Sequence, residues 1–139
     1  MSVSHIILKL FIAIVCGAVI GFEREIRDKA AGLRTHILVC IGACMFGMLG
    51  LSIVGAYNAD ILRLAQGVLI GVGFLGAGVI AREGVSIKGL TTAAGIWVMG
   101  AIGLSIGLGR YNIALIGTIF TLITMALFGR IEKWIKTDK

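Results

Sequence analysis

The residues that could do chemistry are polar side chains at the edges of long apolar runs. Glu23 opens a charged segment after the first run, and Arg34 stands at the entrance to the second. Ionised side chains near an apolar phase are costly unless they are paired, and they mark functional sites by default. Arg34 therefore has two candidate roles, either as an anchor at lipid headgroups or as an inward partner of Glu23. The candidate polar site residues are Glu23, Arg34, Gln66, Thr91 and Thr92.

The charged segment also has the spacing of a helix. Glu23 and Arg27 are four residues apart, and so are Arg24 and Asp28. Opposite charges at this spacing meet on one helix face and contribute about 0.2–0.5 kcal/mol per pair. We expect both as ordinary surface pairs on a helix that continues beyond the apolar run.

Thr91 and Thr92 stand where another apolar run begins. A threonine hydroxyl there can cap the first amides of a helix, which is its commonest use. The alternative is that the amides stay uncapped and, beside Arg82 and Lys88, receive an anion or a carboxylate of a partner.

Enzymatic, metal-binding and nucleic-acid functions are disfavoured. No nucleophile and base pair can be assembled, and His5 and His36 are expected near opposite faces of the membrane. The basic residues fall in loops and form no patch with interleaved aromatics. Without a further ligand nearby, the cysteines make a weak metal site and read as small packing residues, so we expect no cofactor. They are Cys16, Cys40 and Cys44.

The composition predicts a membrane protein. Of 139 residues, 58% are hydrophobic and only 14% are charged, whereas soluble domains have about 25% charged residues. The mean hydropathy is +1.04. We expect an all-α fold in a single domain over residues 1–139, with five spans near the roughly 20 residues that cross a bilayer. These spans are about 5–22, 37–56, 64–80, 89–108 and 113–128.

The basic residues predict how the chain is oriented. Ten of the 13 lysines and arginines fall on one side of the five spans and three on the other. Because cytoplasmic loops carry an excess of positive charge, we expect the N-terminus outside and the C-terminus in the cytoplasm. The protein would then be a multi-pass protein of the bacterial inner membrane, in contact with lipid.

Glycines supply the second pattern, most densely from Gly67 to Trp97. In a bilayer, small residues let helix backbones approach closely, and van der Waals contact then holds the helices together. We expect glycine-rich packing within the chain, and with a second copy or another membrane protein. The glycines predicted to pack helices are Gly17, Gly21, Gly71, Gly73, Gly76, Gly78 and Gly95.

Four segments together resemble the MgtC/SapB family of bacterial inner-membrane proteins, and they span nearly the whole chain in the right order. They are residues 21–25 (GFERE), 31–35 (AGLRT), 73–80 (GFLGAGVI) and 89–97 (GLTTAAGIW). The chain resembles the short members that consist of the membrane domain alone. By matching, the resemblance carries over Glu23, Arg34, Gly76, Gly78, Thr91 and Thr92 as motif residues.

The resemblance implies adaptation to low magnesium and to intracellular or acid stress, including virulence. It also implies regulation of other membrane proteins, notably the F-type ATP synthase. The alternative is a homo-oligomeric channel or transporter for magnesium or protons, lined by the polar candidates. Against a pathway, every acidic residue falls at or beyond the end of a span, and threonines 118, 121 and 124 are expected to bond to carbonyls of their own helix.

Overall fold

The computed structural model describes residues 1–57, 60–83 and 86–129. Within them the chain forms five α-helices, a short π-helix and a two-stranded hairpin. The elements in order are α1 (Val3–Ile26), α2 (Leu33–Tyr57), α3 (Ile61–Ala77), β1 (Ala81–Glu83), β2 (Ser86–Lys88), α4 (Leu90–Gly107), α5 (Tyr111–Ile123) and the π-helix η1 (Thr124–Phe128).

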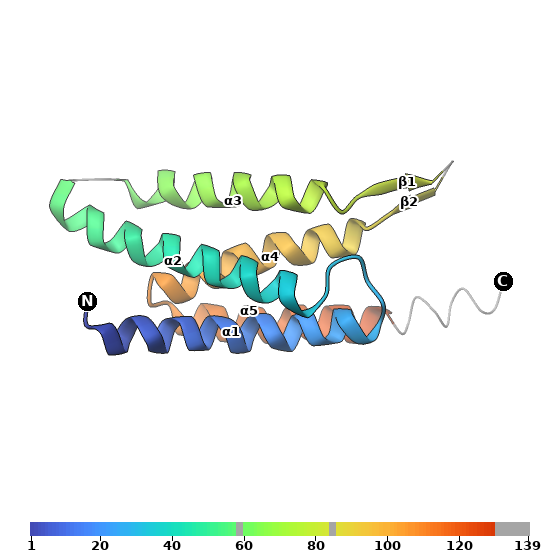
Figure 1. Cartoon of the computed structure of the whole chain (residues 1–139), viewed down its shortest axis with the longest axis horizontal. Coiled ribbons are helices and arrows are strands. Elements are labelled where there is room, and N and C mark those ends of the chain that lie inside the picture. The colour runs from blue at the N-terminus through green and yellow to red at the C-terminus, as the bar shows by residue number, and fades with distance from the viewer. Residues whose placement is uncertain (58–59, 84–85, 130–139) are drawn as a thin grey trace.

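The helices run along one common axis and alternate in direction (Figure 1). The α1–α2 connection, the hairpin and the end of η1 lie at one end of the bundle, called here the hairpin end. The N-terminus and the α4–α5 connection lie at the opposite end. Side chains that are far apart in sequence, at the end of α1 and the start of α4, are thereby brought to the same level.

Four helical segments are long and apolar enough to cross a membrane: Val3–Ile26, Leu33–Ile53, Leu90–Gly107 and Tyr111–Phe128. The prediction of a helical protein with apolar spans is confirmed. The remaining helix, α3, has 17 residues and starts earlier and ends sooner than the predicted span. At about 1.5 Å per residue it is about 26 Å long, slightly less than the roughly 30 Å of bilayer hydrocarbon.

The hairpin departs from the all-α prediction, which treated this segment as a charged turn. Strands β1 and β2 pair antiparallel, with Ala81 opposite Lys88. The chain then turns into α4 at Gly89, whose φ of +90° is accessible to glycine at little cost. A Cβ at Gly89 would also collide with the carbonyl oxygen of Val79. Only glycine fits this junction.

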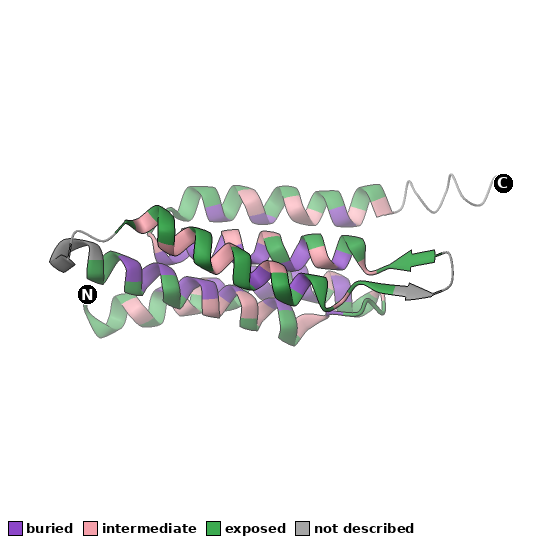
Figure 2. Cartoon of the chain, turned by 90° about the horizontal axis from the view of Figure 1, so that it is seen from above, coloured by how far each residue is buried: buried purple, intermediate pink, exposed green. Residues whose placement is uncertain are grey.

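The core lies where α1, α2 and α4 face one another, and Figure 2 shows the buried positions on these inner surfaces. Its fully buried members include Ile20, Cys40, Cys44, Met99 and Ile106. Large apolar side chains also cover the outside, as expected for a protein whose outer surface meets lipid. Phe11, Phe22, Phe74 and Phe120 are all more than half exposed.

Helices α2 and α4 make the closest contact in the bundle. Gly103 and Gly107 of α4 lie against the carbonyl oxygens of Cys40 and Cys44, so near that an added Cβ would overlap them. On α2, a Cβ at Gly47 would lie 2.9 Å from the carbonyl oxygen of Leu104. Each glycine meets backbone, which cannot rotate aside as a flexible side chain can.

We expect Gly107→Ala to lower the free energy of unfolding by about 1–3 kcal/mol, because α2 and α4 must separate to admit the methyl group. The matched control is Gly73→Ala on α3, where an added Cβ meets nothing within 4 Å. Thermal unfolding of the two purified variants in the same detergent measures the difference. Equal melting temperatures would contradict the close α2–α4 contact.

Candidate functional site

The candidate site is a group of polar side chains at the hairpin end, called here the polar cluster: Glu23, Arg24, Arg27, His36 and Thr92. Arg24, in the last turn of α1, is only 3% exposed. Its Nη2 donates a hydrogen bond of 3.4 Å to the hydroxyl oxygen of Thr92 in α4. The end of α1 is thus tied to the start of α4.

Glu23 lies between the two arginines. Its Oε1 is 2.7 Å from Nε of Arg27, and its Oε2 is 3.4 Å from Nη1 of Arg24. The short contact is an ion pair whose angle is too poor for a hydrogen bond, which leaves Oε1 without a directed donor. The predicted pair of Glu23 with Arg27 is confirmed. The carboxylate offsets much of the cost of burying the Arg24 guanidinium.

Two other ion pairs that the sequence allowed, Arg24 with Asp28 and Arg34 with Glu23, are not formed. Arg24 turns inward to Thr92, and Asp28 lies beyond the last residue of α1 in a left-handed turn with φ of 49°, so these two residues share no helix face. Arg34 does not pair with Glu23, because Glu23 is already held by Arg24 and Arg27. Arg34 is exposed at the start of α2, as suits the alternative role of interfacial anchor.

The start of α4 differs from the predicted threonine cap. Its N-cap residue is Gly89, which has no side chain to cap the first amides. Thr91 and Thr92 lie inside the first turn, Thr91 exposed and Thr92 buried. The first intrahelical bond runs from the N–H of Ala93 to the carbonyl of Gly89. Within the described chain, the amides of residues 90–92 are therefore left uncapped.

Two further side chains fix the backbone around the polar cluster. Arg27 donates from Nη2 to the carbonyl oxygen of Ala126 in η1, at 3.1 Å. Glu25 accepts a hydrogen bond of 2.8 Å from the N–H of Leu33 and so caps the start of α2. Glu25 occupies the space that a side chain at Gly32 would need. The charged residues Glu25 and Arg27, at the end of α1, thus hold the start of α2 and η1 in place through hydrogen bonds.

His36 is fully buried and completes the polar cluster. Its Nδ1 is 2.9 Å from the carbonyl oxygen of Gly32, and because a carbonyl can only accept, Nδ1 carries the proton in this contact. Its Nε2 has no hydrogen-bond partner. Nε2 lies 3.5 Å from the Cβ position of Gly95, where the methyl group of Met125 also approaches. Gly95 therefore makes room for two side chains.

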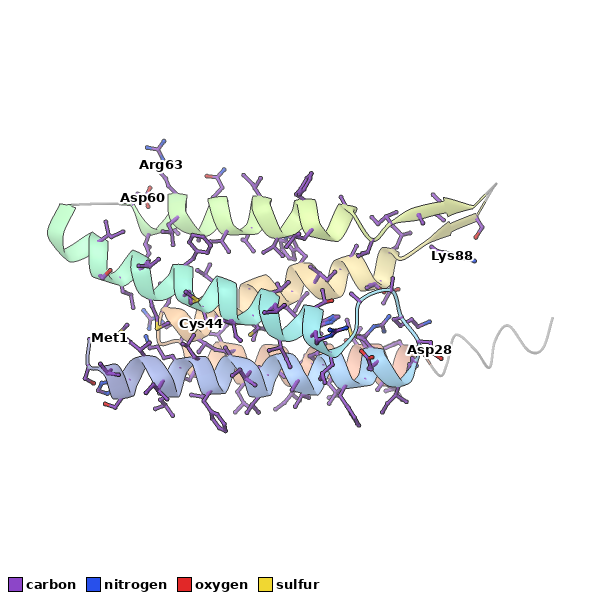
Figure 3. All side chains as sticks on the ribbon, in the orientation of Figure 1. Met1, Asp28, Cys44, Asp60, Arg63 and Lys88 are labelled. Atoms are coloured by element: carbon purple, nitrogen blue, oxygen red, sulfur yellow. The ribbon has the colours of Figure 1, made fainter. Side chains whose placement is uncertain are left out.

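A cavity of about 910 Å³ opens beside the polar cluster, between the end of α1, the hairpin, the start of α4 and η1. Asp28 and Lys88 lie at this end of the molecule in Figure 3. The cavity is lined by both polar and apolar groups. Its basic and hydroxyl-bearing lining residues are Arg24, Arg27, Lys29, Thr91, Thr92 and Thr124.

Gln66 does not join the polar cluster. It is exposed in the first half of α3, which begins at the opposite end of the bundle. Asp60 and Arg63, near it in sequence, lie on the outer side of this end in Figure 3. The structure thus brings Glu23 and Thr92 together at one site, with Thr91 at its edge, and leaves Arg34 and Gln66 outside it.

The predicted packing glycines other than Gly95 fall into three groups. Gly17 and Gly21 lie against the backbone of α2, each with a Cβ position 2.7 Å from a Cα atom, and Gly76 lies 3.1 Å from the carbonyl oxygen of Ala93 on α4. Gly78 meets only carbonyls of its own helix end. Added Cβ atoms at Gly71 and Gly73 would meet nothing within 4 Å, so these glycines make no close contact within residues 1–57, 60–83 and 86–129.

Lys9 is a buried charge that the sequence analysis did not single out. It is 6% exposed, and its ammonium group donates a hydrogen bond of 2.6 Å to the carbonyl oxygen of Gly107. A cation at the last carbonyl of α4 is favourable because the C-terminal end of a helix carries partial negative charge.

The sequence carried a usable signal for the missed residues. Arg24 continues the helical face of Gly17 and Gly21, two of the glycines predicted to pack helices. His36 stands one turn before Cys40 on the buried face of α2. A polar residue on a stripe of small packing residues points into the bundle. The residues described hold no group of three or more His, Cys, Asp or Glu side chains able to bind a metal.

Comparison with known proteins shows which family this chain resembles in sequence. The model of the MgtC family matches residues 10–134. The chain is 44% identical to YhiD of Escherichia coli (strain K12), which is named provisionally as a magnesium transporter, over 92% of this chain and 62% of YhiD. No solved structure matches.

Two further relatives are similar in the same region. Protein SrpB of Synechococcus elongatus is 41% identical over 92% of this chain and 78% of its own length. Protein MgtC of Salmonella typhimurium (strain LT2) is 46% identical over 84% of this chain. The chain thus spans about half the length of MgtC, at 49%, and somewhat more of YhiD. The matched region contains the polar cluster and the helices that position it, and the chain belongs to the MgtC family.

Proposed function

We propose that this chain is a bacterial inner-membrane protein of the MgtC type that contacts and regulates other membrane proteins. It would support growth at low magnesium or under intracellular or acid stress. The F-type ATP synthase is one candidate for the regulated protein. The family supports the physiological setting, and a lateral groove in the bundle supports the mode of action.

The groove lies between α2 and α3 and encloses about 530 Å³. Its lining is almost wholly apolar and includes small residues from both helices. A Cβ at Gly42, Gly67 or Gly71 would meet nothing within 4 Å. Residues along the groove include Leu38, Gly42, Phe46, Gly67, Gly71 and Leu75.

An apolar transmembrane helix of a partner protein suits this groove. Gly67 and Gly71 are one turn apart on α3, so they form a small-residue face of the kind that packs helices in membranes. Elsewhere in the bundle the same device is already used, since Gly17 and Gly103 each meet the backbone of another helix. The open glycines fit a contact that a second chain would complete.

Ion conduction by a homo-oligomer is the second candidate, because the relative YhiD is named provisionally for magnesium transport. The geometry favours it less. The hydroxyls of Thr118, Thr121 and Thr124 are bonded to carbonyls of their own helix at 2.6–2.8 Å. Gln66 and Thr91 are on the outer surface, so the expected lining residues do not converge inside one protomer.

The proposed orientation has the N-terminus outside and the C-terminus in the cytoplasm. Its support is the distribution of ten against three basic residues. In this orientation the hairpin end, with the polar cluster, faces the cytoplasm. Regulatory contacts could then form both in the membrane, along the groove, and at the cytoplasmic surface.

We expect Gly71→Leu to abolish support of growth at low magnesium, because the new side chain fills the groove. The matched control is Gly73→Leu on the same helix, which is equally open but does not line the groove and should behave as wild type. Complementation of a strain lacking its own copy measures growth. Crosslinking in membranes measures partner capture, which should fall about tenfold, as a loss of about 1.4 kcal/mol predicts.

Equal growth of the Gly71→Leu and Gly73→Leu strains would remove the groove from the mechanism. If crosslinking captured only a second copy of this chain, the groove would be assigned to self-association and not to another membrane protein. Both variants should reach the membrane in wild-type amounts, which immunoblotting of membrane fractions checks.

We also expect purified protein in sealed liposomes to pass neither magnesium nor protons above the rate of empty vesicles. The physical reason is the tightly packed apolar interior, with Cys40, Met99 and Ile106 fully buried at its centre. Fluorescent indicators inside the vesicles measure both fluxes. A clear flux that Glu23→Gln reduces would favour the transport candidate over the regulator.

A further inference from the structure

We propose that the cavity at the hairpin end binds a phosphoryl group, supplied either by the headgroup of an anionic phospholipid or by free phosphate. This goes beyond the proposed function, since lateral contact through the α2–α3 groove needs no ligand.

The charge of the cavity suits an anion. Of the residues that the structure describes, three basic ones line it, Arg24, Arg27 and Lys29, against one acidic residue, Asp28. Glu23 offsets part of the charge of Arg24 and Arg27 but does not line the cavity. Lys29 is exposed at the mouth, where it can attract an anion.

The start of α4 supplies uncapped donors. Gly89 provides no capping side chain, and the 18-residue helix directs its first N–H groups and the positive end of its dipole to this side. Thr91 and Thr92, in the first turn, also line the cavity, and each carries a hydroxyl group. Amides and hydroxyls together are the donors that phosphoryl oxygens accept from at helix N-termini.

Arg24 is the independent observation. The residue is 97% buried, yet among the described residues its guanidinium makes only two polar contacts, both at 3.4 Å, and its Nε has no partner. A guanidinium has five N–H donors in a fixed fork that matches a phosphoryl group. Glu23 supplies one carboxylate at 3.4 Å, and this guanidinium, with an unpartnered Nε and a place on the lining of the cavity beside uncapped amides, has donors left for a further anionic ligand.

The two sources differ in what else the cavity must hold. At about 910 Å³ the cavity is far larger than one phosphate, whereas a headgroup with its glycerol would occupy more of it. Ile26, Leu90 and Phe128 add apolar lining beside the basic groups. Basic pockets between transmembrane helices on the cytoplasmic side commonly take anionic lipid headgroups.

The test uses the full chain purified in detergent. Native mass spectrometry measures binding of phosphatidylglycerol and, in parallel, of phosphatidylcholine, which has a phosphoryl group but no net charge. A third arm adds inorganic phosphate, alone and as a competitor. We expect phosphatidylglycerol to bind about tenfold more tightly than phosphatidylcholine, because charge-assisted hydrogen bonds distinguish them.

Two variants probe the site, and one serves as the matched control. Arg24→Gln and Lys29→Gln should each weaken binding of phosphatidylglycerol about tenfold. Arg34→Gln loses the same charge at the same end of the bundle but does not line the cavity, so its binding should stay within about twofold of wild type. Lys29 is exposed, so Lys29→Gln tests the site even where Arg24→Gln disturbs folding.

Binding of the lipid without competition by phosphate would assign the site to a headgroup, and binding or competition by phosphate would assign it to free phosphate. Either result supports a phosphoryl site when Lys29→Gln weakens it and Arg34→Gln does not. The proposal is overturned by equal binding of the two lipids with no binding of phosphate. It is also overturned when all three variants bind like wild type.

Discussion

The backbone contact between α2 and α4 is the constraint on which the rest of the structure depends. Between helices already surrounded by lipid there is no hydrophobic force, so association relies on dispersion at short range. Gly103 and Gly107 allow this short distance between the helices because they leave room for the carbonyls of Cys40 and Cys44. Helix α1 packs on α2 through the same kind of close glycine contact with backbone. Helix α5 packs on the outer side of the bundle. Glycine destabilises a helix in a soluble protein. Here the absence of a side chain lets the helices approach closely enough for dispersion to hold them together.

The polar cluster follows from that packing. Because α4 is fixed against α2, its first turn lies level with the last turn of α1, and Thr92 meets Arg24 inside the bundle. A buried guanidinium must be paired, and Glu23 with its second partner Arg27 provides the pairing. The site is therefore assembled from two distant segments by apolar helix packing. Its charges add hydrogen bonds and ion pairs to this packing. They occupy a junction that the glycines have already set.

Hydropathy was sufficient to predict the helical membrane fold, because runs of this length have few alternatives once backbone groups must be satisfied within lipid. Spacing alone was sufficient for the pair of Glu23 with Arg27. Spacing fails for Arg24, because it gives the helix face of a residue but not the element that this face meets. The hairpin was missed for a related reason: three-residue strands have too little pattern to be distinguished from a turn, and their pairing depends on where α3 ends and α4 begins.

Two buried cations tie α1 to α4 at opposite ends. Lys9 holds the carbonyl of Gly107, and Arg24 holds Thr92. Fifteen residues separate the two cations along α1, and fifteen separate their two acceptors along the antiparallel α4, a distance of about 22 Å on each helix. The two hydrogen bonds thus hold α1 and α4 in one register along their length. If α4 slid by one turn, both cations would lose their acceptors at once, so the two contacts together oppose sliding of α4 along α1.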